Sequence, residues 1–85
     1  MVNQAYVATD ASAITVIAPN FSRTGANLKY EILANNAITI SFSGILIQND
    51  LDSTIVADGG TVIVIELECL TTFWGLKTFR TYTIT

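Results

Sequence analysis

Apolar residues at every second position are the feature that most constrains this chain. Residues 38–43, with the sequence ITISFS, alternate large apolar side chains with small hydroxyl side chains. Side chains on a β-strand point alternately to opposite faces, so this pattern predicts a strand with one buried and one solvent-facing side. The two-residue period recurs along the chain, and 29 of the 85 residues are β-branched (11 Ile, 6 Val and 12 Thr). β-branched residues favour strands. We therefore predict an all-β protein.

The predicted strands are short and follow one another closely. They span residues 6–9, 13–18, 28–33, 38–43, 54–57, 61–72 and 76–85, and Ile45 and Ile47 extend the pattern beyond Gly44. Turn signals every 8 to 12 residues are typical of sandwiches and barrels. The prediction is a single domain over residues 1–85, a small antiparallel sandwich or a jelly-roll or barrel-like domain of about seven or eight strands.

Three predicted strands show which side faces the core. In residues 28–33, Leu28, Tyr30 and Ile32 share one face. Residues 76–85 alternate without interruption and predict a strand with a threonine-lined polar face. In residues 61–72 one face is apolar throughout and the other face begins apolar, which predicts a strand that is central or covered by another chain. The first face holds Ile63, Ile65, Leu67 and Cys69, and the second holds Val62, Val64, Glu66, Glu68 and Leu70.

The connections are predicted from turn-forming residues. Residues 58–60, Asp-Gly-Gly, predict a hairpin turn, and Asn35-Asn36 predicts a turn joining two antiparallel strands. Residues 20–27 form the longest polar stretch and are the predicted functional loop. Residues 8–13 give the only indication of a helical turn, with Asp10 or Ser12 as its cap.

The composition excludes several classes of protein. Charged residues make up 13% of the chain and apolar residues 51%, which excludes a disordered chain. One cysteine excludes an intrachain disulfide framework, and the absence of histidine excludes metal or nucleophile sites built on that residue. Four basic residues against seven acidic ones leave no electrostatic footprint for nucleic acid. The sequence contains no run of about 18 apolar residues, so no membrane span is predicted, and we expect no targeting segment.

The short length favours association with other chains. A domain of this size buries a smaller fraction of its surface than a larger domain does, and it is stabilised in many cases by disulfides, metals or partner chains. Because the first two are excluded or unsupported here, and because few charges would have to be desolvated, we expect association. Edge strands with so little charge are also poorly protected against pairing.

The polar clusters have structural interpretations that outweigh the functional ones. Asp50 and Asp52, with Asn49 and Asp58 nearby, are the candidates for a calcium site, but their spacing matches no calcium loop and a solvated loop is favoured. Glu66 and Glu68 lie on one strand face, where acid–base chemistry on a glycoside is the alternative to pairing with Lys77 or Arg80 across strands.

No enzyme is predicted, and no cofactor or metal. Cys69 lies on the apolar face of its strand and is expected to be a buried small hydrophobe. Ser41, Ser43 and Ser53 have no imidazole to activate them.

The aromatic segment at residues 73–74 is the principal interaction candidate. Phe73 and Trp74 precede Gly75 at a strand boundary. Aromatic side chains dominate protein contact sites, and the alternative is that Trp74 closes the open end of the core. The predicted interface residues are Phe73, Trp74, Leu76, Phe21, Arg23, Val62 and Val64.

The hydroxyl-alternating strands, such as residues 38–43 and the threonine-rich residues 78–83, give the chain its resemblance to a known class of proteins. Short, all-β, almost uncharged and without histidine, the chain resembles small structural proteins of tailed-phage virions, especially capsid cement or decoration proteins. The resemblance implies a jelly-roll or immunoglobulin-like sandwich, a homo-oligomer with a trimer favoured, a larger protein shell such as a major capsid protein as partner, and localisation in the virion after assembly in the host cytoplasm. No family motif is matched, so no functional residue is assigned from the resemblance.

Other classes of function remain open alternatives. The chain could be a tail or neck component of a virion, or a subunit of a surface fibre. It could also be a small carbohydrate-binding module in which Trp74 or Tyr82 stacks on a sugar ring.

Overall fold

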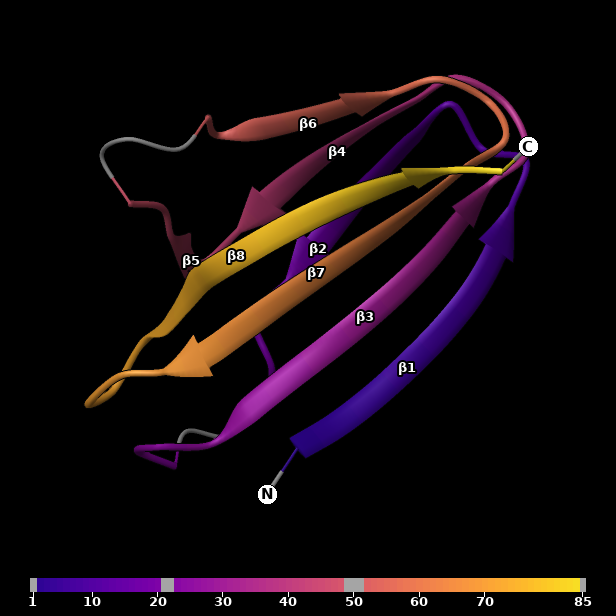
Figure 1. Cartoon of the computed structure of the whole chain (residues 1–85). Helices are drawn as coiled ribbons and strands as arrows, with labels where there is room; N and C mark the ends of the chain where they lie inside the picture. The colour runs from indigo at the N-terminus through magenta and orange to yellow at the C-terminus, as the bar shows by residue number, and fades with distance from the viewer. Residues whose placement is uncertain (1, 21–22, 49–51, 85) are drawn as a thin grey trace.

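The structure is a computed structural model, and it describes residues 2–20, 23–48 and 52–84 of the chain. It contains eight strands and, among these residues, no helix (Figure 1). The strands are β1 (Val2–Thr9), β2 (Ala13–Ile17), β3 (Asn27–Ala34), β4 (Ile38–Ser43), β5 (Ile45–Leu46), β6 (Thr54–Ala57), β7 (Thr61–Cys69) and β8 (Trp74–Thr83). The all-β prediction is confirmed. None of the described residues forms a helix that is long and apolar enough to cross a membrane.

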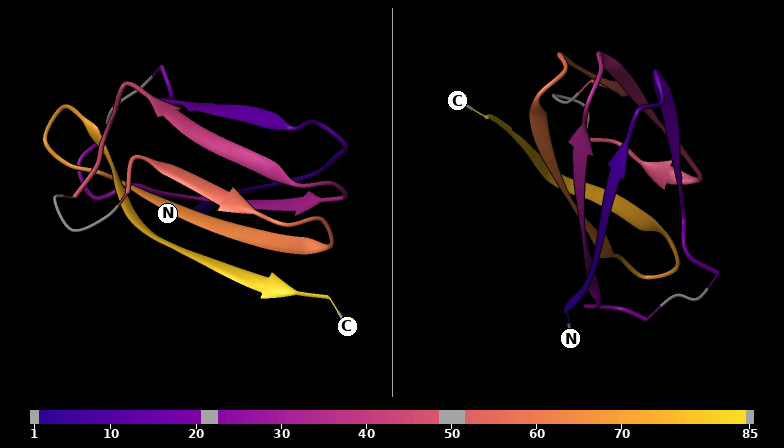
Figure 2. Two further views of the ribbon diagram at one scale, coloured as in Figure 1. Left: turned by 90° about the horizontal axis from the view of Figure 1, so that it is seen from above. Right: turned by 90° about the vertical axis from the view of Figure 1, so that its right-hand side faces the viewer.

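The strands form two facing sheets. The larger sheet has the order β1-β3-β7-β8-β5 and the smaller has the order β2-β4-β6 (Figure 2). The predicted sandwich of about eight strands is therefore confirmed. The sheets are mixed, however, because β1 pairs with β3, β2 with β4, and β5 with β8 in parallel.

Two of the parallel pairs, β1 with β3 and β2 with β4, follow from how the chain crosses between the sheets. From β1 to β4 each successive strand lies in the opposite sheet, so the chain reverses direction at each crossing. Strands two apart in sequence therefore run the same way side by side. Gly44, with a φ of 72°, lies at a further switch, from β4 to β5 in the other sheet.

Two turns predicted to join paired strands connect the sheets instead. Asn35-Asn36 leads from β3 to β4, and residues 58–60 lead from β6 to β7, and in both cases the two strands belong to different sheets. The hairpin prediction was wrong for these turns because residues tolerant of tight turns favour the reversal without specifying whether the two strands pair or face each other.

The crossings stack on one another at one end of the sandwich, at the end where the C-terminus lies (Figure 1). Asn35 N donates to Thr9 O at 3.0 Å, and Gly60 N donates to Ala34 O at 2.8 Å. A Cβ on Gly59 would lie 2.8 Å from Asn35 O, so only glycine fits this close approach. The stacked crossings therefore hold the two sheets in register.

The helical turn predicted at residues 8–13 is not present. β1 continues to Thr9, and the chain then turns into β2. The side-chain amide of Asn35 donates to Asp10 Oδ1 at 2.8 Å, and that of Asn36 donates to Asp10 O at 3.2 Å. Asp10 thus links the first crossing to the second, where we had expected a helix cap.

The core lies between the sheets, on the faces that the sequence pattern predicts. Leu28 and Ile32 of β3 are buried, Tyr30 packs against the core, and β7 is central in the larger sheet. The largest fully buried side chains are Ile38, Ile40, Ile63, Ile65, Leu67 and Leu76.

A bulge in β8 breaks the alternation predicted for residues 76–85. Leu67 lies opposite Leu76, whereas Glu66 lies opposite Thr78, so Lys77 has no opposite residue on β7. Leu76 and Phe79, three residues apart, consequently both face the core. Thr81 follows Phe79 on the inner face. Sequence periodicity cannot show an inserted residue when both flanking segments alternate.

Candidate interaction surface

The outer face of the larger sheet carries an apolar row across four strands. The backbone register aligns Ala8 of β1, Leu33 of β3, Val62 of β7 and Tyr82 of β8. Leu33 and Val62 are half-buried, and Tyr82 is 52% exposed. We call these four residues the apolar row. A flat line of apolar side chains on a solvent-facing sheet is typical of an interaction surface.

The next two rows of this face are charged. The row beside the apolar row aligns Tyr6, Glu31, Val64 and Arg80, and Val64 between its two charged neighbours is only 6% exposed. Arg80 Nη2 lies 3.0 Å from Oε1 of Glu66. This ion pair confirms the predicted cross-strand role of Glu66.

The second glutamate of that predicted pair has different neighbours. Glu68 lies opposite Asn27 and Gly75, rather than opposite Lys77 or Arg80. The outer face of the larger sheet is thus charged in the rows that contain Glu31, Glu66 and Glu68, and it is apolar in the row nearest the stacked crossings.

The second half of β8 forms a free sheet edge. β5 pairs with β8 only at Trp74 and Gly75, and Gln48 Nε2 donates to Leu76 O at 3.4 Å and to Lys77 O at 3.2 Å. Among the described strands, none pairs with the outer side of residues 78–83, which we call the free edge. The end of β8 diverges from the smaller sheet (Figure 2), and residues 80–83 are exposed.

The two aromatic residues of the predicted interface point to opposite environments. Leu70 N donates to Phe73 O at 2.8 Å and closes the turn between β7 and β8. Phe73 at this turn is 58% exposed, whereas Trp74 is 2% exposed and packs in the core. Trp74 is therefore a core residue.

The other predicted interface residues divide in the same way. Leu76 is buried in the core beside Trp74, so neither residue is available as a surface anchor. Val62 is half-buried, Arg23 is exposed, and Phe21 lies outside the described residues. The alternating pattern did not show which of Phe73 and Trp74 faces the core, because either residue could be the first inward-facing residue of the strand.

The structure brings Arg23 and Phe73 to the same end of the molecule. The backbone N of Arg23 donates to Cys69 Sγ at 3.2 Å, and Cys69 N donates to Ala26 O at 2.8 Å. Thr24 Oγ1 donates to Thr71 O in the turn that contains Phe73, at 3.3 Å. Cys69 is buried, as expected. The described part of the predicted functional loop is therefore anchored on the end of β7.

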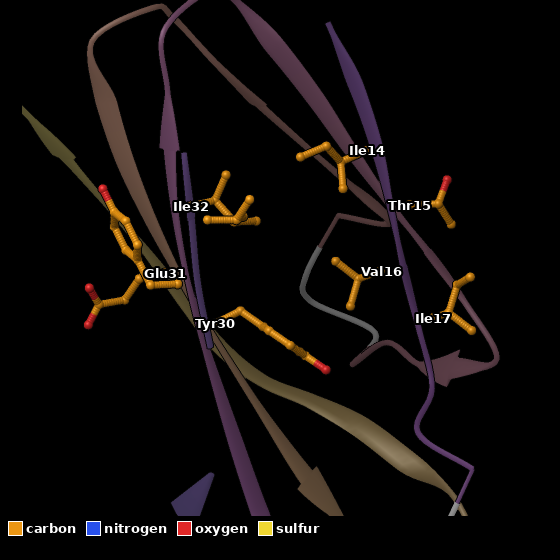
Figure 3. A pocket seen from close by; sticks show the side chains of 9 residues that line it. Ile14, Thr15, Val16, Ile17, Tyr30, Glu31 and Ile32 are labelled. Atoms are coloured by element: carbon orange, nitrogen blue, oxygen red, sulfur yellow. The ribbon is translucent and has the colours of Figure 1, made fainter. Parts of the chain in front are cut away.

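An apolar cleft of about 230 Å³ opens between the edge strands β1 and β2. Figure 3 shows Ile14, Val16, Tyr30 and Ile32 pointing into the space between the sheets, whereas Ile17 points away. The complete lining is Tyr6, Val7, Ile14, Thr15, Val16, Ile17, Tyr30, Glu31 and Ile32. The cleft therefore offers mainly apolar contact together with the side chain of Tyr30, whereas Glu31 and Thr15 point away from the space between the sheets (Figure 3).

The calcium alternative finds no cluster in the described part of the chain, where no three carboxylate, thiol or imidazole groups come together. Asp52 and Asp58 are exposed there, while Asn49 and Asp50 lie outside the described residues. In the carbohydrate alternative, burial removes Trp74 as a stacking platform and leaves Tyr82.

Sequence reasoning missed two members of the apolar row, Ala8 and Leu33. One signal was present, because Leu33 follows Lys29 and Glu31 on the polar side of its strand. Its alignment with Val62 and Tyr82 depends on strand order, which the sequence does not reveal. Comparisons with protein families, with curated proteins and with solved structures find no match to this chain.

Proposed function

We propose that this chain is a non-enzymatic structural protein that assembles as a homo-oligomer on a larger protein shell. The apolar row is the observation that carries the proposal, because four aligned apolar positions on the solvent side of a sheet favour burial against another protein. The charged residues of that face lie in the rows beyond the apolar row, and two of them, Glu66 and Arg80, form an ion pair.

The kind of shell is proposed from the resemblance to capsid cement and decoration proteins. A protein of this kind binds a repeating lattice, such as a major capsid protein, and is expected in the virion after assembly in the host cytoplasm. A trimer is the oligomer that the resemblance implies. A tail or neck component and a fibre subunit would use the same surfaces on a different partner.

The test is cosedimentation with particles purified from the source that encodes the chain. We expect the chain to sediment with a shell, and Val62→Glu to reduce its binding because a carboxylate would be buried in the apolar row. Val56→Glu is the matched control, since Val56 is 74% exposed and lies in the smaller sheet. Absence of the chain from every large particle, or equal binding by the two variants, contradicts the proposal.

A carbohydrate-binding module is the second candidate, supported by the exposed ring of Tyr82. Binding on a glycan array that disappears in Tyr82→Ala and survives in Tyr6→Ala would favour it over the structural role. Stacking on a sugar needs an accessible aromatic face, and both rings are exposed.

A further inference from the structure

We infer that a second copy of this chain pairs with the free edge of β8, antiparallel and about a two-fold axis at Thr81. The inference rests on the self-association in the proposed function and specifies its contact as a two-fold dimer, in place of the trimer that the resemblance implies. The free edge has three properties that favour strand addition: its outer side is unpaired among the described strands, its end is exposed, and Arg80 is its only charged residue. Natural edge strands avoid such pairing by means of charge, proline or bulges.

Symmetry restricts the possible registers. A two-fold axis perpendicular to a continuous sheet keeps every residue on its own face, and opposite residues of an antiparallel pair also share a face. The axis must therefore lie midway between one residue and the same residue of the second copy. The candidate centres within the free edge are therefore single residues, and each centre predicts a different set of cross-strand pairs.

The centre at Thr81 gives the most favourable pairs. On the outer face it places Arg80 opposite the uncharged Tyr82 of the second copy, twice, so that no like charges lie directly opposite each other. Glu66 already holds Arg80 on that face at 3.0 Å, which lowers the net charge at the junction. On the inner face Phe79 meets Thr83, and Thr81 meets its own symmetry mate.

The neighbouring centres are less favourable. An axis at Arg80 would place two guanidinium groups directly opposite each other, which destabilises a strand pair. An axis at Phe79 would bring the second copy against Lys77, where Gln48 already occupies the carbonyl group. An axis at Tyr82 would leave Arg80 opposite Ile84 and shorten the ladder. The Thr81 register pairs residues 78–84 and joins the two larger sheets into one.

The register is tested by oxidative cross-linking of Thr81→Cys and Thr83→Cys. Opposite Cα atoms in an antiparallel pair lie about 4.5–5.5 Å apart, within the range of a disulfide. The two Thr83 positions would lie about 13 Å apart, four residues along the strand. Both residues are exposed threonines on one face of one strand, so the variants are closely matched. Cys69 is buried in both, and the unmodified chain controls for it.

We expect Thr81→Cys to form a covalent dimer at least about ten-fold faster than Thr83→Cys. Equal rates, or cross-linking of Thr83→Cys alone, would overturn the Thr81 register. A trimer mass that persists in Thr81→Lys would also overturn the pairing, because a trimer needs a different contact. If cross-linking fails while Val62→Glu still reduces binding to particles, the pairing is wrong and the proposed function stands. If the variants cross-link as expected and no particle binds the chain, the pairing stands without the shell.

Discussion

The two halves of β8 show how one strand divides its work between folding and association. Its first residues, Trp74 to Leu76, are buried, and Trp74 and Gly75 have neighbouring strands on both sides. The free edge pairs only with β7, and its last residues are exposed. Both halves pair with β7. They differ in burial because only the first half has another strand, β5, on its far side, and because the end of β8 diverges from the smaller sheet (Figure 2). Changes in the first half should affect folding, and changes in the second should affect assembly.

The largest effect is expected from Trp74→Ala. Removing this buried ring from the core should lower the free energy of unfolding by about 3–5 kcal/mol. Chemical denaturation followed by circular dichroism measures the loss. Phe73→Ala is the control, and it should cost less than about 1 kcal/mol because Phe73 is mostly exposed. Similar losses of unfolding free energy in the two variants would contradict the placement of Trp74 in the core and of Phe73 at an exposed turn.

Leu76→Ala should have the next largest effect on folding. The side chain is fully buried, so its truncation should cost about 2–4 kcal/mol of unfolding free energy. Thr81→Ala, in the other half of the same strand, should change unfolding by no more than about 0.5 kcal/mol. The same denaturation experiment tests both, and a large loss in Thr81→Ala would show that the free edge is part of the fold.

Gln48→Ala tests the boundary between the halves. The amide of Gln48 donates to the carbonyl oxygens of Leu76 and Lys77, so its loss should cost about 1 kcal/mol. Hydrogen exchange measured by NMR should show faster exchange in β5 and at the start of β8, and unchanged exchange in the middle of β7. Faster exchange throughout β7 would mean that the hydrogen bonds of Gln48 stabilise the whole sheet rather than only the start of β8.

The smallest effect on folding is expected from Glu66→Gln. An exposed ion pair contributes at most about 1 kcal/mol, so the fold should change little. Association should weaken more, since two unneutralised Arg80 side chains would lie beside the symmetry axis. Parallel measurements of unfolding and of dimer mass separate the effects. A fall in stability with unchanged dimerisation would place the ion pair in the fold alone.

The sequence pattern predicted the strands and the buried faces better than it predicted their arrangement. Alternation placed Ile63, Ile65 and Leu67 in the core correctly, because one residue's neighbours two positions away share its face. The turns at residues 35–36 and 58–60 were recognised as turns, but whether they join paired or facing strands depends on the whole chain.

The candidate surface was predictable only in part. Val62 was identifiable because the second face of its strand begins apolar, and Phe73 because it is aromatic beside a glycine. The free edge was not identifiable, since it depends on β5 pairing with β8 at only two positions and on the bulge at Lys77. Both are consequences of tertiary packing rather than of local pattern.

Sedimentation equilibrium of the unmodified chain and of Thr81→Lys tests most directly whether the free edge serves association. We expect the unmodified chain to approach twice its 9.2 kDa mass at micromolar concentration. Thr81→Lys places two like charges at the symmetry axis and should weaken the dimer by about ten-fold or more. Thr39→Lys, on an exposed position of the smaller sheet, should leave the dimer unchanged. A monomer at every concentration, or equal dimerisation by the two lysine variants, would contradict this assignment.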